Sequence, residues 1–238
     1  MGDPLATFRA AAADLGLQVQ LGLGPAYDLR AGEGLRLRDL APWARGGLLL
    51  LSGGGAFFDR FRADGPPTGD DPLDTWTRAR VEELLAPLRA AGVRAAARHP
   101  FWNEPDPLPF QRIGAAAGLP TAVPLGLHLH PVYGTWLAYR ALILLDIPVE
   151  EAPPLPADPC AGCDAPCRAA CPAGAVTAGG WNALACVDHR VAGADPCADG
   201  CHARLACPRG ARHRYPLPTR RFHQAASHAT ARAFRTPR

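Results

Sequence analysis

Hydrophobic and polar positions alternate at helical spacing between Asp71 and Gly92. Leu73, Trp76, Leu84 and Leu88 recur along one face of this stretch, as the 3.6-residue period of a helix requires. Asp71 suits the N-cap, Pro72 suits the first turn and Gly92 suits the end of the helix. The pattern predicts one long helix over this stretch, with Pro87 disturbing its last turn.

Continuous apolar runs predict strands on either side of this helix. The runs GGLLLLS at 46–52 and VRAAARH at 93–99 are short and are predicted to be buried strands. Residues 125–146 predict two extended runs around the turn His-Pro-Val-Tyr-Gly. Because helices alternate with strands, we expect an α/β domain over residues 1–149.

A proline-rich segment interrupts this pattern at residues 150–159. Its sequence, EEAPPLPADP, disfavours a helix and favours an extended linker. The cysteines follow directly, and residues 160–215 are rich in loops and poor in large apolar side chains. We therefore predict a small, bacterial-ferredoxin-like α+β domain over residues 160–215, followed by an arginine-rich tail over residues 216–238.

Composition adds limits on the class of protein. The chain has 238 residues, of which 48% are hydrophobic and 20% are charged, enough to bury a core in one large or two small domains. It has no run of eighteen apolar residues, and its first residues lack the pattern of a secretory signal. The sequence thus predicts a cytoplasmic protein with no membrane partner.

All the basic side chains are arginines, and their distribution is uneven. The formal net charge is only +3, but nine arginines and no acidic residue follow Asp199. Abundant Ala, Pro, Gly and Arg is typical of a GC-rich genome, which weakens the case for nucleic acid. The arginine-rich end is either a solvated, partly frayed terminus or a docking face for an acidic redox partner protein or for phosphates.

Eight cysteines lie between Cys160 and Cys207, and the first 159 residues contain none. A cytoplasmic compartment keeps thiols reduced, so this crowding indicates metal ligands rather than disulfides. The cysteines form two sets of four, and each set ends in Cys-Pro. These sets are Cys160, Cys163, Cys167 and Cys171, and Cys186, Cys197, Cys201 and Cys207.

Two such sets are typical of ferredoxins with two [4Fe–4S] clusters, in which the last cysteine of each set ligates the other cluster. This crossing assigns Cys160, Cys163, Cys167 and Cys207 to one cluster. It assigns Cys171, Cys186, Cys197 and Cys201 to the other. Two structural zinc ions are the alternative, although only Cys160 and Cys163 form a Cys-x-x-Cys pair.

The spacing departs from the standard run at two places. Three residues separate Cys163 from Cys167 where two are usual, and five separate Cys201 from Cys207 where three are usual. The departures bear on the shape of each loop more than on the identity of the ligands.

The cysteine pattern resembles the iron–sulfur domain of epoxyqueuosine reductase, a family akin to the reductive dehalogenases. The resemblance extends upstream to Ala117-Gly118-Leu119 and to the turn HPVYGTW at 130–136. It covers roughly residues 100–215 and implies an α/β corrinoid-binding domain, with cobalamin possible, and two [4Fe–4S] clusters that deliver electrons to cobalt one at a time. Short proteobacterial dicluster ferredoxin-like proteins resemble the chain more closely, through AYR, ACP, RYP and FH.

The sequence also departs from epoxyqueuosine reductase. That family continues into a helical-repeat domain that holds transfer RNA, and this sequence stops at Arg238. The family's aspartate proton donor falls at Glu104 in this chain. Glu104 could act as a general acid, but a carboxylate in a proline-rich loop is more often solvated, and Asp106 lies equally near.

Three weaker candidates precede the cysteines. The loop 52–55, Ser-Gly-Gly-Gly, follows an apolar strand and is either a plain turn or a phosphate site for a flavin or corrinoid. His128 and His130 share one side of an extended run and are either half-buried residues or ligands of cobalt or another metal. The aromatic residues that follow are predicted to be core: Tyr133, Trp136 and Tyr139.

These patterns predict an iron–sulfur protein that relays single electrons through two [4Fe–4S] clusters to an acceptor or corrinoid held by the N-terminal domain. A corrinoid-dependent reductase related to epoxyqueuosine reductase and an iron–sulfur redox sensor are the alternatives. If the chain is an enzyme, the cysteines make it an iron–sulfur oxidoreductase. The sequence identifies no catalytic residue.

Overall fold

The computed structural model describes residues 2–101, 104–153, 155–156 and 158–235. The chain divides into two compact units. Unit 1 comprises residues 1–119 and 137–155, and unit 2 comprises residues 120–136 and 156–238. The predicted linker at 150–159 therefore does contain one boundary. In addition, residues 120–136 group with the cysteine-rich part rather than with the N-terminal part.

Unit 1 is a mixed α/β unit built on one four-stranded sheet. The strand order is β1-β2-β6-β3, and every neighbouring pair is antiparallel. The strands are β1 (Val19–Leu23), β2 (Gly46–Gly53), β3 (Ala95–Arg98) and β6 (Leu137–Leu145). The helices are α1 (Pro4–Asp14), α2 (Pro25–Ala31), α3 (Leu37–Leu40), α4 (Ala56–Ala63), α5 (Pro72–Ala90) and α6 (Phe110–Ala116). The alternation of helices and strands is confirmed, without the parallel pairing that is common in α/β domains.

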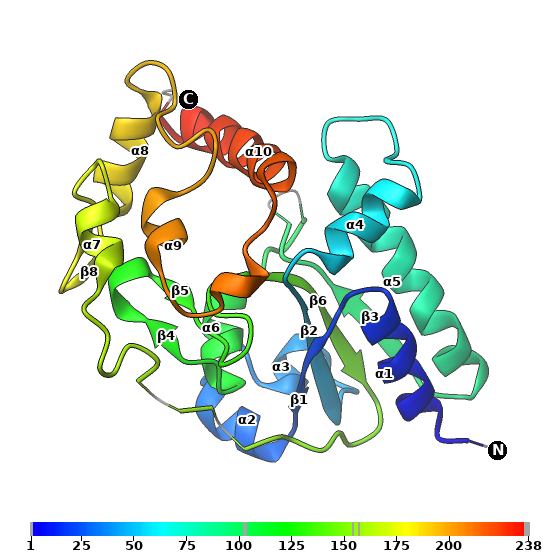
Figure 1. Ribbon diagram of the computed structural model, residues 1–238. Coiled ribbons are helices and arrows are strands. Elements are labelled where there is room, and N and C mark those ends of the chain that lie inside the picture. Colours follow the sequence, from blue (N-terminus) through cyan, green and yellow to red (C-terminus); the bar gives the residue numbers. More distant parts are fainter. Residues whose placement is uncertain (1, 102–103, 154, 157, 236–238) are drawn as a thin grey trace. The chain divides into compact units, whose positions relative to one another are not determined.

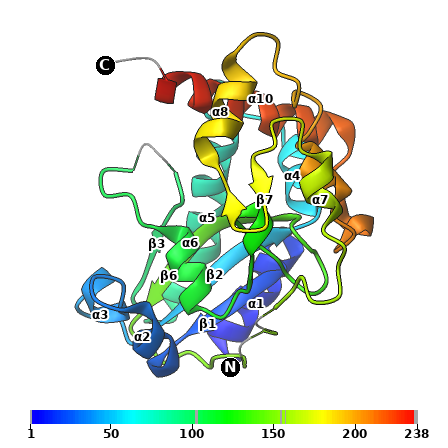
Figure 2. The same ribbon diagram turned by 90° about the vertical axis from the view of Figure 1, so that its left-hand side faces the viewer.

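The central strands form the core of unit 1. All eight residues of β2 are buried, as are the last six of β6. Helix α1 packs against α5, and α2 packs against α6. Figures 1 and 2 show these two pairs on opposite faces of the sheet. Because both faces are covered, apolar residues can follow one another along β2 without a polar face.

The long helix predicted from Asp71 to Gly92 is confirmed as α5. Pro72 occupies the first turn and Pro87 lies inside the helix. Asp71 is at the N-cap, although its side chain accepts no helix N–H from the described residues. The buried face includes Trp76, which meets the Phe57 ring edge-on at 5.0 Å between centroids.

Unit 2 consists of short elements around a small core. Its strands pair in two antiparallel hairpins, β4 (Thr121–Ala122) with β5 (Leu127–His128) and β7 (Val176–Thr177) with β8 (Gly180–Trp181). Its helices are η1 (Val123–Leu125), α7 (Pro166–Ala170), α8 (Ala183–Val191), α9 (His202–Ala206), η2 (Ala211–His213) and α10 (Leu217–Arg235). The first of the two extended runs predicted in 125–146 thus shrinks to β5, while the second is the long strand β6.

Backbone contact fixes residues 130–136 within unit 2. Gly134 and Gly210 both have positive φ angles, of 58° and 66°, and each backbone packs directly against the other segment. A Cβ atom on Gly134 would overlap the carbonyl of Arg209, so only glycine fits there. The Arg204 guanidinium adds a cation–π contact, 4.4 Å from the centroid of the Trp136 ring.

The predicted arginine-rich tail is instead a 19-residue helix, α10. It packs against α8, and Arg235 forms an ion pair with Asp188. Thr219 and Ala231 are its buried residues. The four arginines of this helix, and the absence of any acidic residue from it, explain why the sequence suggested a basic tail. No described helix is long and apolar enough to cross a membrane.

Candidate metal centres

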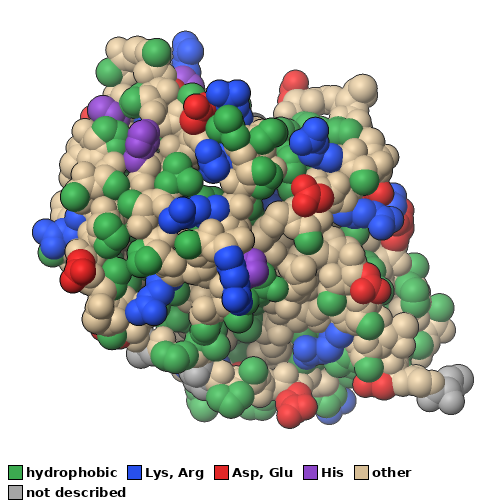
Figure 3. Space-filling view, in the orientation of Figure 1, with side chains coloured by type: hydrophobic (Ala, Val, Ile, Leu, Met, Phe, Trp, Pro, Cys, Tyr) green, Lys and Arg blue, Asp and Glu red, His purple; other side chains and the backbone are tan. Residues whose placement is uncertain are grey.

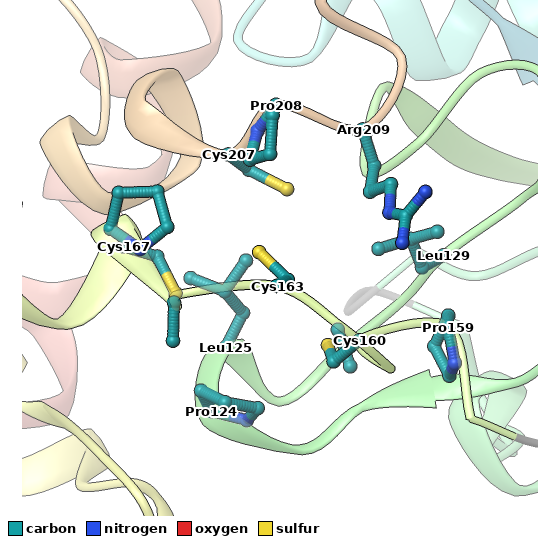
Figure 4. Close-up of a pocket in the computed structure, with 13 residues that line it drawn as sticks. Pro124, Leu125, Leu129, Pro159, Cys160, Cys163, Cys167, Cys207, Pro208 and Arg209 are labelled. Atoms are coloured by element: carbon teal, nitrogen blue, oxygen red, sulfur yellow. The ribbon is translucent and has the colours of Figure 1, made fainter.

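The first thiol site comprises Cys160, Cys163, Cys167 and Cys207, whose sulfurs surround one pocket in unit 2 (Figure 4). The first three come from the loop before α7 and from α7 itself, and Cys207 is the C-cap of α9. These are the four residues that the crossing pattern assigns to one cluster. The pocket's apolar lining includes Ala122, Leu125 and Leu129 from the segment that precedes the cysteines.

A left-handed residue accommodates the extra position between Cys163 and Cys167. Ala165 has φ 51° and ψ 52°, and it is the sole non-glycine residue with positive φ in the described part of the chain. Such a conformation costs roughly 1–2 kcal/mol for a residue with a Cβ. Ala165 is the N-cap of α7, so it turns the chain back and lets Cys167 face the same pocket as Cys163.

The second thiol site comprises Cys171, Cys186, Cys197 and Cys201. Cys171 is the C-cap of α7, Cys186 lies in α8, and Cys201 is the N-cap of α9. Cys171 therefore leaves the loop of the first motif and joins the cysteines of the second motif. Burial raises the pKa of the Cys186 thiol, and nearby Cys201 and Cys171 raise it further.

The effects of neighbouring thiols on one another's pKa are consistent with this grouping. Burial raises the pKa of Cys160, and so do the neighbouring thiols Cys207, Cys163 and Cys167. Burial also raises the pKa of Cys197 to about 11, with Cys201 as the next contribution. All eight cysteines are free thiols. Because each site concentrates thiols that resist ionisation, a bound cation would have to displace their protons.

The second thiol site contains a buried cation. The side chain of Arg190 is 9% exposed and forms a 2.6 Å ion pair with Asp195, whose side chain is 5% exposed. Arg190 also donates to the Ser227 hydroxyl and to the Gln224 carbonyl of α10. Its charge lowers the pKa of both Cys186 and Cys197, against the larger effect of burial. The sequence analysis missed Arg190, since an arginine in a short helix carries no signal of burial.

Two further contacts shape the surroundings of these thiols. The indole N–H of Trp181, on β8, donates a hydrogen bond to the Cys186 sulfur. The Asp158 carboxylate accepts a 2.9 Å hydrogen bond from the Cys160 backbone N–H. The four-thiol sets match the donor sets of [4Fe–4S] clusters and of four-cysteine zinc sites alike. No three His, Cys, Asp or Glu side chains among the described residues are grouped closely enough to hold a single metal ion.

The two histidines that the sequence offers as metal ligands make hydrogen bonds within unit 2. His128 is buried, and its Nδ1 lies 3.4 Å from both the Thr121 hydroxyl and the Pro120 carbonyl. The Nδ1 of His130 accepts the Val132 backbone N–H at 3.2 Å. Both histidines thus hold their own turns, as the half-buried alternative predicts.

Of the three aromatic residues predicted to be core, Trp136 is buried, whereas Tyr133 and Tyr139 are half-buried. Trp136 is 2% exposed. Burial raises the pKa of Tyr139, whose ring contacts Phe110 at 5.7 Å between centroids. Tyr133 lies against the His213 ring at 4.7 Å.

The loop at 52–55 and Glu104 belong to unit 1. The Ser52 hydroxyl accepts a 3.1 Å hydrogen bond from Arg140 Nε. This contact and the start of α4 after Gly55 describe a plain turn. Glu104 forms an ion pair with Arg78, and Asp106 pairs with Arg98 at 3.2 Å. Both carboxylates of the proline-rich loop therefore have arginine partners.

Comparison with solved structures identifies the fold. The chain aligns with selenomethionine-labelled epoxyqueuosine reductase at a TM-score of 0.61 and 17% identity, over 91% of this chain and 68% of that one. The enzyme from Bacillus subtilis aligns at a TM-score of 0.60 and 17% identity, over 90% of this chain and 67% of that one. Epoxyqueuosine reductase in complex with a tRNA-Tyr stem loop aligns at a TM-score of 0.61 and 18% identity, over 90% of this chain and 67% of that one. No protein-family model matches the sequence, and no curated protein matches it significantly. The chain has an epoxyqueuosine reductase-like fold.

Proposed function

We propose that this chain is an iron–sulfur electron-transfer protein that relays single electrons through two [4Fe–4S] clusters to an acceptor held by unit 1. One observation carries the proposal. Cys207 of the second motif lines the same pocket as Cys160, Cys163 and Cys167 of the first, and Cys171 of the first motif lies near enough to Cys186 to raise its pKa. Each cluster would exchange one electron at a time, and the chain would supply the thiolates, the apolar lining and the surrounding charges.

The arrangement of the cysteines favours clusters over zinc. Zinc knuckles commonly take their ligands as Cys-x-x-Cys pairs from two places in the chain. The first thiol site contains one such pair, Cys160 and Cys163, and the second contains none. A crossing last cysteine is typical of two-cluster ferredoxins, in which one short chain encloses both cubanes.

Metal analysis tests this proposal directly. Protein purified without oxygen should contain about eight iron atoms and about eight acid-labile sulfides per chain. Reduction should produce the EPR signals of two reduced clusters. Stoichiometric zinc with little iron would overturn the proposal, whatever the activity of the preparation.

An iron–sulfur oxidoreductase is the second candidate, and the epoxyqueuosine reductase-like fold favours it. A corrinoid in unit 1 would make such an enzyme resemble that family more fully. Neither the loop 52–55 nor the candidate general acid Glu104 favours a corrinoid, because the loop is a plain turn whose Ser52 hydroxyl accepts from Arg140, and Glu104 is paired with Arg78. We therefore derive no corrinoid step. A visible spectrum of the anaerobic protein distinguishes the two candidates, since corrinoid bands would stand above the broad iron–sulfur absorption.

A further inference from the structure

Unit 2 carries a strong excess of positive charge. Residues 156–238 contain eleven arginines and five aspartates, and residues 120–136 contain no charged residue of either kind except histidine. Three of the aspartates are already paired with arginines near the second thiol site or on α10. These pairs are Arg190 with Asp195, Arg221 with Asp199, and Arg235 with Asp188. Because these three pairs are neutral, the net positive charge of unit 2 comes from its other arginines.

Part of this charge lies beside the first thiol site, on residues 208–214, which we call the basic segment. Arg209, Arg212 and Arg214 are all exposed. Arg209 lines the thiol pocket and donates to the Ala161 carbonyl, and Arg212 contacts the His213 ring nitrogen. Within the described part of the chain, none of the three guanidinium groups has a carboxylate partner. Figure 3 shows basic side chains over the surface that η2 occupies in Figure 1.

The basic segment is held in place by the rest of unit 2. Gly210 packs its backbone against Tyr133, and the Tyr133 ring contacts His213. Arg209 and Arg214 are also close enough to Cys207 to lower its pKa against the effect of burial. The opposing charges of the first motif are Asp158, which binds the Cys160 N–H, and Asp164. Arg209 thus lines the pocket into which four thiols point, Arg214 lies near Cys207, and Arg212 follows on the same segment.

We propose that the basic segment is the docking surface for a small acidic protein that carries one electron. This inference rests on the proposed function. Complementary charge would steer the carrier to the pocket edge, where its redox group comes close to the first thiol site. One electron would leave the reduced carrier and enter the oxidised cluster, so that no bond forms or breaks. Redox encounters commonly use small, transient interfaces, which three arginines and the flanking Pro208 could supply.

The location favours a protein carrier over RNA as the partner. Cations strengthen the binding of a phosphate backbone wherever they lie on the surface, because its charge is spread along the chain. Cations speed electron transfer from a protein carrier only if they hold it near the redox site. Arg209 lines the thiol pocket and Arg212 and Arg214 follow it directly, while Arg221 and Arg235 farther along the chain are paired with aspartates.

Stopped-flow reduction of the anaerobic holoprotein tests the docking surface. The probe is photoreduced plant-type ferredoxin, an acidic one-electron carrier. Combined Arg209→Glu, Arg212→Glu and Arg214→Glu substitutions should slow its second-order reaction at least tenfold at low ionic strength. Salt at about 0.5 M should remove most of the difference. The milder pair Arg212→Gln and Arg214→Gln keeps the Arg209 contact and should slow the reaction about threefold.

A matched control separates location from net charge. Arg38→Glu, Arg45→Glu and Arg62→Glu change three exposed arginines of unit 1 and alter the net charge equally. This variant should react within threefold of the wild-type rate, and dithionite should reduce all variants alike. Equal slowing of both triple variants, or no slowing of either, would overturn the docking surface. So would loss of RNA-hairpin binding in the basic-segment variant with an unchanged ferredoxin rate. Wild-type protein without iron would instead overturn the proposed function itself.

Discussion

The two thiol sites have the same four donors but different electrostatic surroundings. At the first site the nearby cations are exposed arginines of the basic segment, which solvent screens. At the second site the cation is Arg190, buried and ion-paired with Asp195. Trp181 adds a hydrogen bond to the Cys186 sulfur. Positive charge and sulfur hydrogen bonds stabilise the reduced, more negative cluster, so they raise its potential.

This difference predicts a direction for electron transfer. Arg190 acts in a less screened environment than the exposed arginines do, so we expect the second cluster to have the higher reduction potential. An electron that enters at the basic segment would therefore move from the first site to the second. A single buried ion pair would thus give two sets of four cysteine ligands in one small unit different roles.

The largest effect should come from removing one cysteine from each site. Combined Cys163→Ala and Cys171→Ala should abolish both clusters, although both residues lie in the first motif. Combined Cys171→Ala and Cys197→Ala should spare one cluster, because both residues belong to the second site. Iron content and the EPR signals of the reduced variants measure the outcome. One intact cluster in the Cys163 and Cys171 variant would mean that the motifs bind independently.

Removing the clusters should unfold unit 2 and spare unit 1. The core of unit 2 is small, and the buried residues of its main cluster include Cys167 and Cys207. Metal cages must therefore supply much of its folding free energy. Unit 1 keeps its own buried sheet and should resist protease after chelation. Limited proteolysis of apoprotein and holoprotein checks this, and equal resistance of residues 160–215 in both would contradict it.

Replacing Arg190 should destabilise the second site selectively. Arg190→Met leaves the buried Asp195 carboxylate unpaired, which typically costs about 3 to 5 kcal/mol. The matched control is Arg221→Met, because Arg221 pairs with Asp199 at 2.7 Å on the exposed surface. That change should leave the free energy of unfolding nearly unchanged, because solvent screens an exposed pair. Denaturant unfolding of the holoproteins measures both values.

The same variant sharpens the electrostatic comparison. If Arg190→Met still binds iron, the potential of the second cluster should fall while that of the first stays constant.

Burial favours the neutral form of Asp195, but hydrogen bonds from Arg190 and from the Cys197 N–H lower its pKa overall. The pair's contribution to stability is therefore present above the unfolded pKa, near 4, and is lost as the pH falls. Equal costs for Arg190→Met and Arg221→Met would show that burial does not distinguish the two pairs.

The sequence predicted the donor residues better than their surroundings. Cysteine spacing and the Cys-Pro endings suggested the two sets, because thiols that share a site must recur at short intervals. The helix α5 was predictable from its apolar period and from Pro72. In contrast, Arg190 looks like any surface arginine, since its burial depends on α10, which lies more than twenty-five residues farther along the chain.

Residues 120–136 show why their grouping with unit 2 could not be predicted from the sequence. Their apolar side chains fit an extended run of unit 1 equally well in the sequence, yet Leu125 and Leu129 line the thiol pocket. The contact that fixes them joins the backbones of Gly134 and Gly210, 76 positions apart. In the sequence, the only trace of this backbone contact is the two glycines themselves. A glycine inside an aromatic turn, followed by another after Cys-Pro, is too common a pattern to predict a pairing.

The smallest effect that we predict concerns Trp181. Trp181→Phe keeps an aromatic ring on β8 and removes the N–H donor to the Cys186 sulfur. The side chain is 48% exposed, so the change should cost little stability and leave the iron content unchanged. Loss of one sulfur hydrogen bond should lower the potential of the second cluster, by less than Arg190→Met does, and leave the first cluster as it was.

Another exposed apolar side chain, three positions farther along the chain, provides the control for this effect. Leu184 is 54% exposed, lies at the start of α8 and has no polar donor, so Leu184→Ala should change neither potential. EPR-monitored redox titration of the three proteins separates the two clusters. A fall in the first potential, or an equal fall in the Leu184→Ala variant, would show that Trp181 acts through general solvent exposure. A selective fall in the second potential would instead assign part of the asymmetry between the sites to one hydrogen bond, in addition to the buried charge of Arg190.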